Sequence, residues 1–278
     1  MGNLFRMLFF SDRVLRIFSE PLSLPKKLIT RLHWKIISLY FNSAPYVKEQ
    51  VEVFDKLDLD FKSSEDILND VYSKFPFLDC DEGSCHHHFF AACSRQKAVN
   101  NILEIGTYTG HCAALLSELF PSAMIDTIDL PDDHPVFSFS YDRRNKVIRE
   151  KFIENRNTLL ASKNNVNFLQ IDSQRLTLIE DKKYDLIWID GAHGYPVVTI
   201  DIVNSLRLLN KGGVIACDDV WTAGRKRGKL YDSMATYETL RALKSANVID
   251  FELIHKRLNN FHLHPRYRKY IAICRVKD

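Results

Sequence analysis

From about residue 100 onward, short apolar segments alternate with longer segments that have the period of a helix. The seven short segments are 100–106, 123–129, 166–172, 184–190, 212–219, 250–256 and 270–276. They are apolar throughout, as parallel strands buried on both faces are. Helical segments separate all of them except the last two. The sequence therefore predicts an α/β fold, a doubly wound, mostly parallel seven-stranded sheet with a terminal antiparallel hairpin.

The first 80 residues lack this alternation and predict a helical N-terminal extension to a main domain over 81–278. Apolar residues such as Leu28, Leu32 and Ile36 recur at helical spacing. Ser63 with Asp66 three residues later predicts the start of a further helix through a capping pair.

Charge is uneven along the chain, although the net charge is only +3. Residues 1–41 carry seven Lys and Arg against two acids. For this basic extension we favour packing on the main domain or in a homodimer. Coverage of a substrate pocket and contact with an anionic membrane surface stay open. No basic–aromatic stripe indicates a nucleic-acid partner.

The sequence also indicates the cellular compartment of the protein. No apolar run is long enough to cross a bilayer. Arg6 and Asp12 interrupt a signal peptide, and Arg6 stands where myristoylation requires Ser or Thr. The six scattered cysteines predict free thiols in a reducing compartment, so we expect a cytoplasmic protein.

The first strand runs into LEIGTYTG, residues 103–110. Glycines at a strand-to-helix turn let a ligand approach the backbone closely. The spacing from Gly106 to Gly110 is not that of a dinucleotide site, and Tyr108 stands where the second glycine of that motif would be. These residues favour a cofactor without phosphates. Asp129 ends the second strand, where an acid can accept both ribose hydroxyls.

Together with TIDL, FLQIDS, DLIWIDGAHGYPVVTIDI and LLNKGGVIACDDV, this motif resembles the class I S-adenosylmethionine-dependent methyltransferases over residues 81–278. The resemblance implies that Glu104 and the 106–110 turn flank the methionine part of the cofactor, that Asp129 holds the ribose, and that the adenine lies near the residues after the third strand. The cofactor-binding residues that it implies are Glu104, Gly106, Thr107, Tyr108, Gly110, Asp129, Asp172, Ser173 and Asp190.

The DGAH and CDD motifs resemble those of the small-molecule O-methyltransferase branch, which includes catechol-type and bacterial sugar and macrolide enzymes. In its metal-dependent members, acids matching Asp190, Asp218 and Asp219 bind one divalent cation. Acids that end neighbouring strands can converge on one ion, and an all-carboxylate set suits Mg²⁺. Two alternatives stay open: the acids orient the substrate without a metal, or they only end a strand and cap a helix.

His193 occupies the position of the catalytic lysine of the catechol-type enzymes, three residues after Asp190. Histidine can act as a base near neutral pH, so we predict that it deprotonates the acceptor. In the alternative interpretation, His193 caps its loop or binds the ion through a water molecule.

Three further segments have weaker signals. CDEGSCHHHFFAAC, residues 80–93, lacks the ligand spacing of a zinc site. One of its three histidines faces the active site, or they form a polar helix face. The basic run over 225–229 attracts an anionic acceptor or is a solvated loop. The insertion over 131–144 follows a strand at the edge where a lid could form.

The sequence thus predicts methyl transfer from S-adenosylmethionine to a hydroxyl of a sugar-like, phenolic or natural-product acceptor. Metal-independent transfer to an amine, protein or lipid is one alternative. The other is a module that binds the cofactor or a partner without turnover.

Overall fold

The computed structural model describes residues 36, 42–78, 83–96, 98–140, 143–176, 181–223, 233–265 and 267–277. The predictions for residues 1–35 and for the basic run over 225–229 lie outside these ranges. No described helix is long and apolar enough to cross a membrane.

Seven strands form one sheet in the order β3-β2-β1-β4-β5-β7-β6. Their bounds are β1 Asn101–Ile105, β2 Met124–Asp129, β3 Val166–Gln170, β4 Tyr184–Ile189, β5 Leu209–Val220, β6 Ile249–His255 and β7 Tyr270–Val276. The first five are parallel, and β7 is antiparallel to both β5 and β6. The predicted fold class, with its terminal hairpin, is confirmed.

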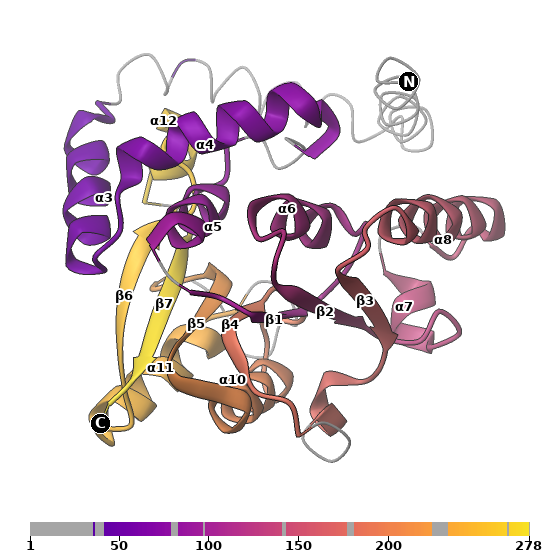
Figure 1. The fold of residues 1–278 in the computed structure, drawn as a ribbon. Helices are drawn as coiled ribbons and strands as arrows, with labels where there is room; N and C mark the ends of the chain where they lie inside the picture. The colour runs from indigo at the N-terminus through magenta and orange to yellow at the C-terminus, as the bar shows by residue number, and fades with distance from the viewer. Residues whose placement is uncertain are drawn as a thin grey trace.

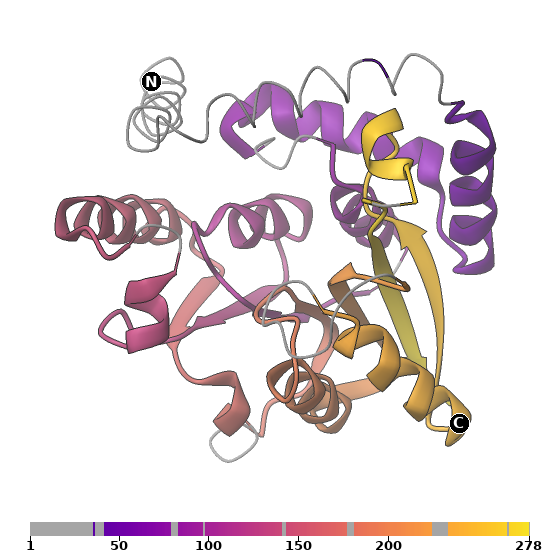
Figure 2. The same cartoon turned by 180° about the vertical axis from the view of Figure 1, so that it is seen from behind.

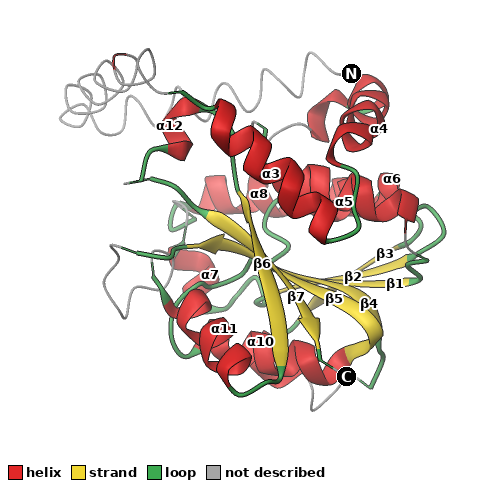
Figure 3. Cartoon of the chain, turned by 90° about the vertical axis from the view of Figure 1, so that its left-hand side faces the viewer, coloured by secondary structure: helices red, strands yellow, loops and turns green. Residues whose placement is uncertain are grey.

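Helices cover both faces of the sheet, as Figures 1 and 3 show. On one face lie α5 Cys85–Gln96, α6 His111–Leu119 and α8 Lys146–Ala161, and on the other α10 Val197–Leu208 and α11 Ala235–Ser245. Successive residues of β4 alternate between two apolar cores: Leu186 and Trp188 face one, Ile187 and Ile189 the other. This double coverage explains why β4 has apolar residues on both of its faces.

Short helical segments fill several connections. These are η2 Pro76–Leu78, α7 Pro135–Phe139, η3 Ser173–Arg175 and α12 Asn260–Leu263. The insertion over 131–144 thus contains α7. None of the five described cysteines forms a disulfide with another described cysteine.

The described part of the extension contains α3 Ala44–Lys56 and α4 Phe61–Lys74. The first packs against β6 and the second against α5 (Figure 2). The predicted start of α4 at Ser63 is wrong. Asp60 is the N-cap, because its carboxylate accepts from the backbone N–H groups of Lys62 and Ser63. The helix therefore begins two residues earlier.

Candidate functional site

The register of the sheet brings four predicted site residues to one level at the carboxyl edge. Strand β1 pairs in parallel with β2 and β4, and β4 pairs with β5. The last residues that pair across all four strands are Ile128, Ile105, Ile189 and Cys217. The next residues of β2, β1, β4 and β5, in that order, are Asp129, Gly106, Asp190 and Asp218. Neighbouring strands lie about 4.8 Å apart, so these residues form a short row.

Gly106 closes the first turn tightly against the loop after β4. Its φ is +110°, and a Cβ built on it would lie 2.4 Å from the carbonyl oxygen of Asp190. Its N–H donates to the carbonyl of Ile128, 2.9 Å away. Only a residue without a side chain fits this backbone approach.

Glu104 lies in β1, two residues before Gly106, and is fully buried. Its Oε2 accepts a hydrogen bond from the hydroxyl of Thr127, which also contacts Thr107. Its Oε1 is buried and accepts no hydrogen bond of good geometry from the described residues. Burial raises the pKa of Glu104 to about 7. A positively charged ligand group at Oε1 would satisfy this carboxylate.

Asp129 shapes the turn after β1. Its Oδ2 accepts from the N–H of Tyr108 at 3.0 Å, and its Oδ1 accepts from the N–H of Leu130 at 2.8 Å. Tyr108 has φ of 47°, and Gly110 starts α6 in the left-handed region. The acid therefore holds the glycine turn in place at the β2 end of the row.

Asp190 and His193 are neighbours in the loop after β4. The distance from His193 Nε2 to Asp190 Oδ1 is 3.6 Å, longer than a hydrogen bond. The Asp190 side chain is 34% exposed, whereas that of His193 is 6% exposed. Burial lowers the pKa of His193, so the imidazole is neutral near pH 7. Burial and the charge of Asp218 raise the pKa of Asp190.

Asp218 and Asp219 both contact Lys256, although successive residues of a regular strand point to opposite faces. The pairing of β5 with β7 is irregular between Cys217 and Val220, and Asp219 has φ of 54°. This distortion turns both carboxylates toward one ammonium group. Lys256 Nζ donates to Asp218 and, at 2.6 Å, to Asp219.

The charges of two lysines stabilise this acid pair. Lys269 Nζ donates to the other oxygen of Asp219 at 2.5 Å. Although burial alone would raise the pKa values of Asp218 and Asp219, Lys256 lowers both. Sequence reasoning missed both lysines. The available signal was that Lys256 directly follows β6, one of the two strands of the terminal hairpin that pairs with β5 through β7.

The predicted divalent-cation centre on Asp190, Asp218 and Asp219 is not shown. Among the described residues, no group of three or more His, Cys, Asp or Glu side chains could hold a metal ion. Instead, Lys256 lies against the two carboxylates at the end of β5 and provides them with positive charge.

The polar groups of Asp172 and Ser173, which follow β3, form hydrogen bonds with nearby residues. Asp172 caps the η3 turn by accepting from the N–H of Gln174 at 3.0 Å. The carbonyl of Ser173 accepts from Asn204 on α10 at 3.2 Å. No hydrogen bond among the described residues connects them to the row, so their assignment to the adenine stays a prediction.

Each of the three histidines of α5 has a hydrogen-bond partner of its own. His86 is buried, bonds to Ser84 and stacks on Trp188 with ring centroids 5.0 Å apart. His87 bonds to the hydroxyl of Tyr72 on α4. His88 bonds to Ser64 of α4 at 2.8 Å, which is a packing contact between helices.

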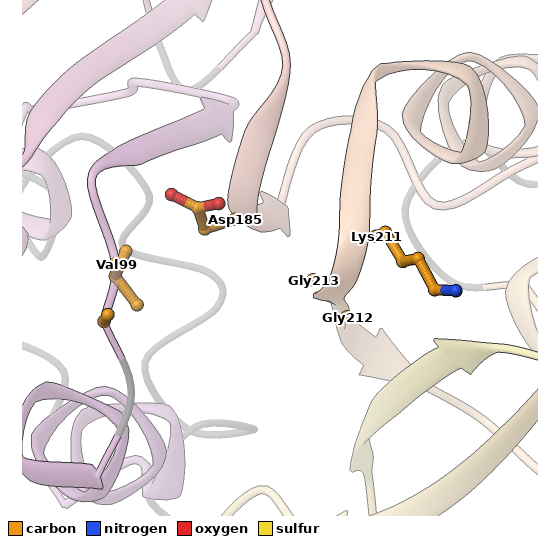
Figure 4. Close-up of a pocket in the computed structure, with 6 residues that line it drawn as sticks. Val99, Asp185, Lys211, Gly212 and Gly213 are labelled. Atoms are coloured by element: carbon orange, nitrogen blue, oxygen red, sulfur yellow. The ribbon is translucent and has the colours of Figure 1, made fainter.

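Figure 4 shows a pocket at the opposite edge of the sheet. Its lining residues are Ala98, Val99, Asp185, Lys211, Gly212 and Gly213. Asp185 stands near the start of β4, whereas Asp190 follows the end of that strand. No predicted site residue lines this pocket, and in parallel α/β sheets ligands bind at the carboxyl edge.

The strand order, the terminal hairpin and the glycine turn after β1 define the fold of class I methyltransferases. Residues 103–220 match the model of a family described as a methyltransferase domain. This part of the chain is a methyltransferase domain. The match agrees with the predicted resemblance to class I S-adenosylmethionine-dependent methyltransferases and with the prediction of an enzyme.

Solved structures with similar folds are distant in sequence. A Klebsiella pneumoniae protein assigned as an O-methyltransferase is 15% identical, with TM-score 0.49, and the match covers 88% of this chain and 95% of that one. PaMTH1 of Podospora anserina, bound to S-adenosylhomocysteine, is 20% identical with TM-score 0.48, over 69% and 77%. O-methyltransferase TomG of Streptomyces achromogenes, bound to S-adenosylmethionine, is 14% identical with TM-score 0.46, over 88% and 95%. No curated protein sequence matches the chain.

Proposed function

We propose that the chain transfers a methyl group from S-adenosylmethionine to a hydroxyl of a small molecule, with His193 as the base. The observation that carries this proposal is the row at the carboxyl edge of the sheet. It sets a tight glycine turn and Asp129 on one side, and Asp190 with His193 on the other.

The residues at the first turn fit the cofactor chemically. The buried carboxylate of Glu104 has an oxygen without a hydrogen bond of good geometry, which suits the ammonium group of the methionine part. The absence of a side chain at Gly106 lets that part lie against the backbone. The carboxylate of Asp129 is half-buried at the end of β2, where it can accept ribose hydroxyls.

S-adenosylmethionine, when bound, would supply an activated methyl group for the acceptor oxygen, and its sulfur would keep the electron pair of the bond that breaks. The chain has to align the acceptor oxygen with that methyl group and remove the hydroxyl proton. His193 is neutral near pH 7 and would take this proton, becoming imidazolium. Asp190 lies beside the imidazole and would stabilise its charge. A phenol or a sugar hydroxyl meets this requirement.

Calorimetry with S-adenosylhomocysteine tests the cofactor site. We expect the wild type to bind and Asp129→Ala to bind roughly 10- to 100-fold more weakly, since charge-assisted hydrogen bonds contribute about 1.5–3 kcal/mol. Asp185→Ala, at the opposite edge of the sheet, is the matched control and should bind like the wild type. Folded wild-type protein that gives no binding heat would end the proposal.

The pKa of Glu104 gives a second expected result. Cofactor binding favours the carboxylate, whereas the free protein holds a proton there up to about pH 7. Affinity for S-adenosylhomocysteine should therefore rise between pH 6 and pH 8, by up to about tenfold per pH unit below the pKa. Binding should also release a proton, which calorimetry in buffers of different ionisation enthalpy measures.

Glu104→Gln is the control for this result, because the amide oxygen can still accept from Thr127. Its affinity should be weaker and should not change over that pH range. An equal pH dependence in the wild type and Glu104→Gln would show that another group binds the proton.

A further inference from the structure

The two acids at the end of β5, Asp218 and Asp219, already have a cation that belongs to the chain. Lys256 follows the last residue of β6, and its side chain is 9% exposed. Its Nζ donates to Asp218 and Asp219, and Lys269 donates to the second oxygen of Asp219. Three of the four carboxylate oxygens of the pair thus accept from ammonium groups. Both oxygens of Asp219 are taken, so a hard divalent cation bound by both acids would compete with an ammonium group there.

The backbone of Lys256 is fixed from two sides. Its N–H donates to the carbonyl of Lys269 at 3.0 Å, which extends the β6–β7 pairing by one step. Its carbonyl accepts from the N–H of Cys85 at 2.7 Å, at the start of α5. The side chain therefore starts from an anchored position, and its direction toward the acids does not depend on a ligand.

The two lysines also need the acids. They stand opposite each other just beyond the hairpin pairs of β6 and β7, where like charges repel. The carboxylates of Asp218 and Asp219 lie against both ammonium groups and offset this repulsion. The distorted end of β5, with Asp219 at φ of 54°, is the conformation that lets both carboxylates reach Lys256.

We propose that Lys256 is a positioning residue that provides, in place of a divalent cation, the positive charge beside Asp190 and His193, and that methyl transfer needs no metal. The proposal rests on the function proposed above. Lys256 fixes the acid pair and sets the electrostatic field in which His193 accepts the acceptor's proton. It neither binds the methyl group nor takes the proton.

Binding of Mn²⁺ to chelator-treated protein, followed by calorimetry and electron paramagnetic resonance, tests this proposal. We expect the wild type to bind Mn²⁺ with Kd no tighter than about 1 mM. Lys256→Ala should bind at least about tenfold more tightly, because two buried carboxylates lose their cation. Adding Asp218→Asn to that variant should abolish the gain.

Lys163→Ala is the matched control, since Lys163 is also 9% exposed and ion-paired, with Glu118 far from the site. It should bind Mn²⁺ no better than the wild type. Micromolar Mn²⁺ binding by the wild type that Asp218→Asn removes would overturn the proposal. So would a folded Lys256→Ala variant without any gain.

A second measurement on the wild type covers the case in which Lys256→Ala does not fold. In wild-type protein with ¹⁵N-labelled lysine, the ammonium signal of Lys256 is identified as the one that is missing from Lys256→Arg. The protons of this ammonium group should exchange slowly with water. The signal should not shift in about 5 mM Mg²⁺, a concentration that would occupy a weak oxygen site. A shift of that signal with Mg²⁺ would contradict the proposal. S-adenosylhomocysteine binding, measured in the same samples, distinguishes a failure of the proposed function from a failure of this inference. Absence of S-adenosylhomocysteine binding counts against the proposed function. Micromolar Mn²⁺ binding counts only against the role of Lys256.

Discussion

Replacing Gly106 by alanine is expected to weaken S-adenosylhomocysteine binding at least about 100-fold, a loss of about 2.7 kcal/mol. The new Cβ would lie 2.4 Å from the carbonyl oxygen of Asp190 and 2.7 Å from its carbonyl carbon. Both are backbone atoms, so no side chain can move to make room. The φ of +110° adds strain of about 1–3 kcal/mol for a residue with a side chain. The turn after β1 and the loop after β4 must therefore separate.

Calorimetry measures the binding loss, and a thermal melt measures stability. We expect Tm to fall by several degrees, since about 1 kcal/mol corresponds to roughly 2–4 °C in a domain of this size. Gly191→Ala is the matched control in the neighbouring loop. A Cβ there would be 3.6 Å from Ile105, an ordinary contact, so binding should stay near the wild-type value. Wild-type affinity in Gly106→Ala would mean that the cofactor does not use this turn.

The sheet could be predicted from the sequence because its signals are local. Each strand is a short apolar run bounded by turn residues, and the helices between the strands force parallel pairing. The candidate row followed from the same reasoning, since parallel strands end at a common edge. Asp129, Gly106, Asp190 and Asp218 are level in the register.

Contacts between distant segments could not be predicted in this way. Lys256 meets Asp218 only because β7 lies between β5 and β6, and because an irregular end of β5 turns two successive acids to one side. Periodicity carries no information about either. The three acids alone predict a metal ion, and nothing in the sequence predicts the lysine that lies against two of them. The prediction of where α4 starts was wrong for a related reason. Asp60 and Ser63 are both residues that cap helices well, and only the backbone geometry selects Asp60.

Replacing His193 by glutamine is expected to lower kcat by about 10²–10⁴-fold, the range over which positioned general bases act. Glutamine keeps most of the volume and polarity of the side chain but cannot take a proton near pH 7. Affinity for S-adenosylhomocysteine should stay within about threefold of the wild type, because a change of 0.6 kcal/mol or less is expected for a group that does not contact the cofactor. Release of S-adenosylhomocysteine with a panel of sugars and phenols identifies an acceptor and gives kcat.

The pH profile distinguishes a base from a structural residue. Burial lowers the pKa of His193, so the imidazole is neutral over more of the acidic range than an exposed histidine. Wild-type kcat should therefore stay on its plateau as pH falls through 6.5 and decline only at lower pH, where the imidazole is protonated. The residual activity of His193→Gln should lack this decline. His88→Gln, which alters a histidine bonded to Ser64 on α4, is the control and should keep both the wild-type kcat and its profile.

An acidic limb that persists in His193→Gln would assign the proton to another group. Asp190 is the first candidate, because its carboxyl lies 3.6 Å from the imidazole and its pKa is raised. Asp190→Asn would then remove the limb that His193→Gln leaves. If His193→Gln instead turns over at the wild-type rate, the acceptor reacts without a base at this position. An amine acceptor, which can react with its nitrogen lone pair, would then be favoured over a hydroxyl.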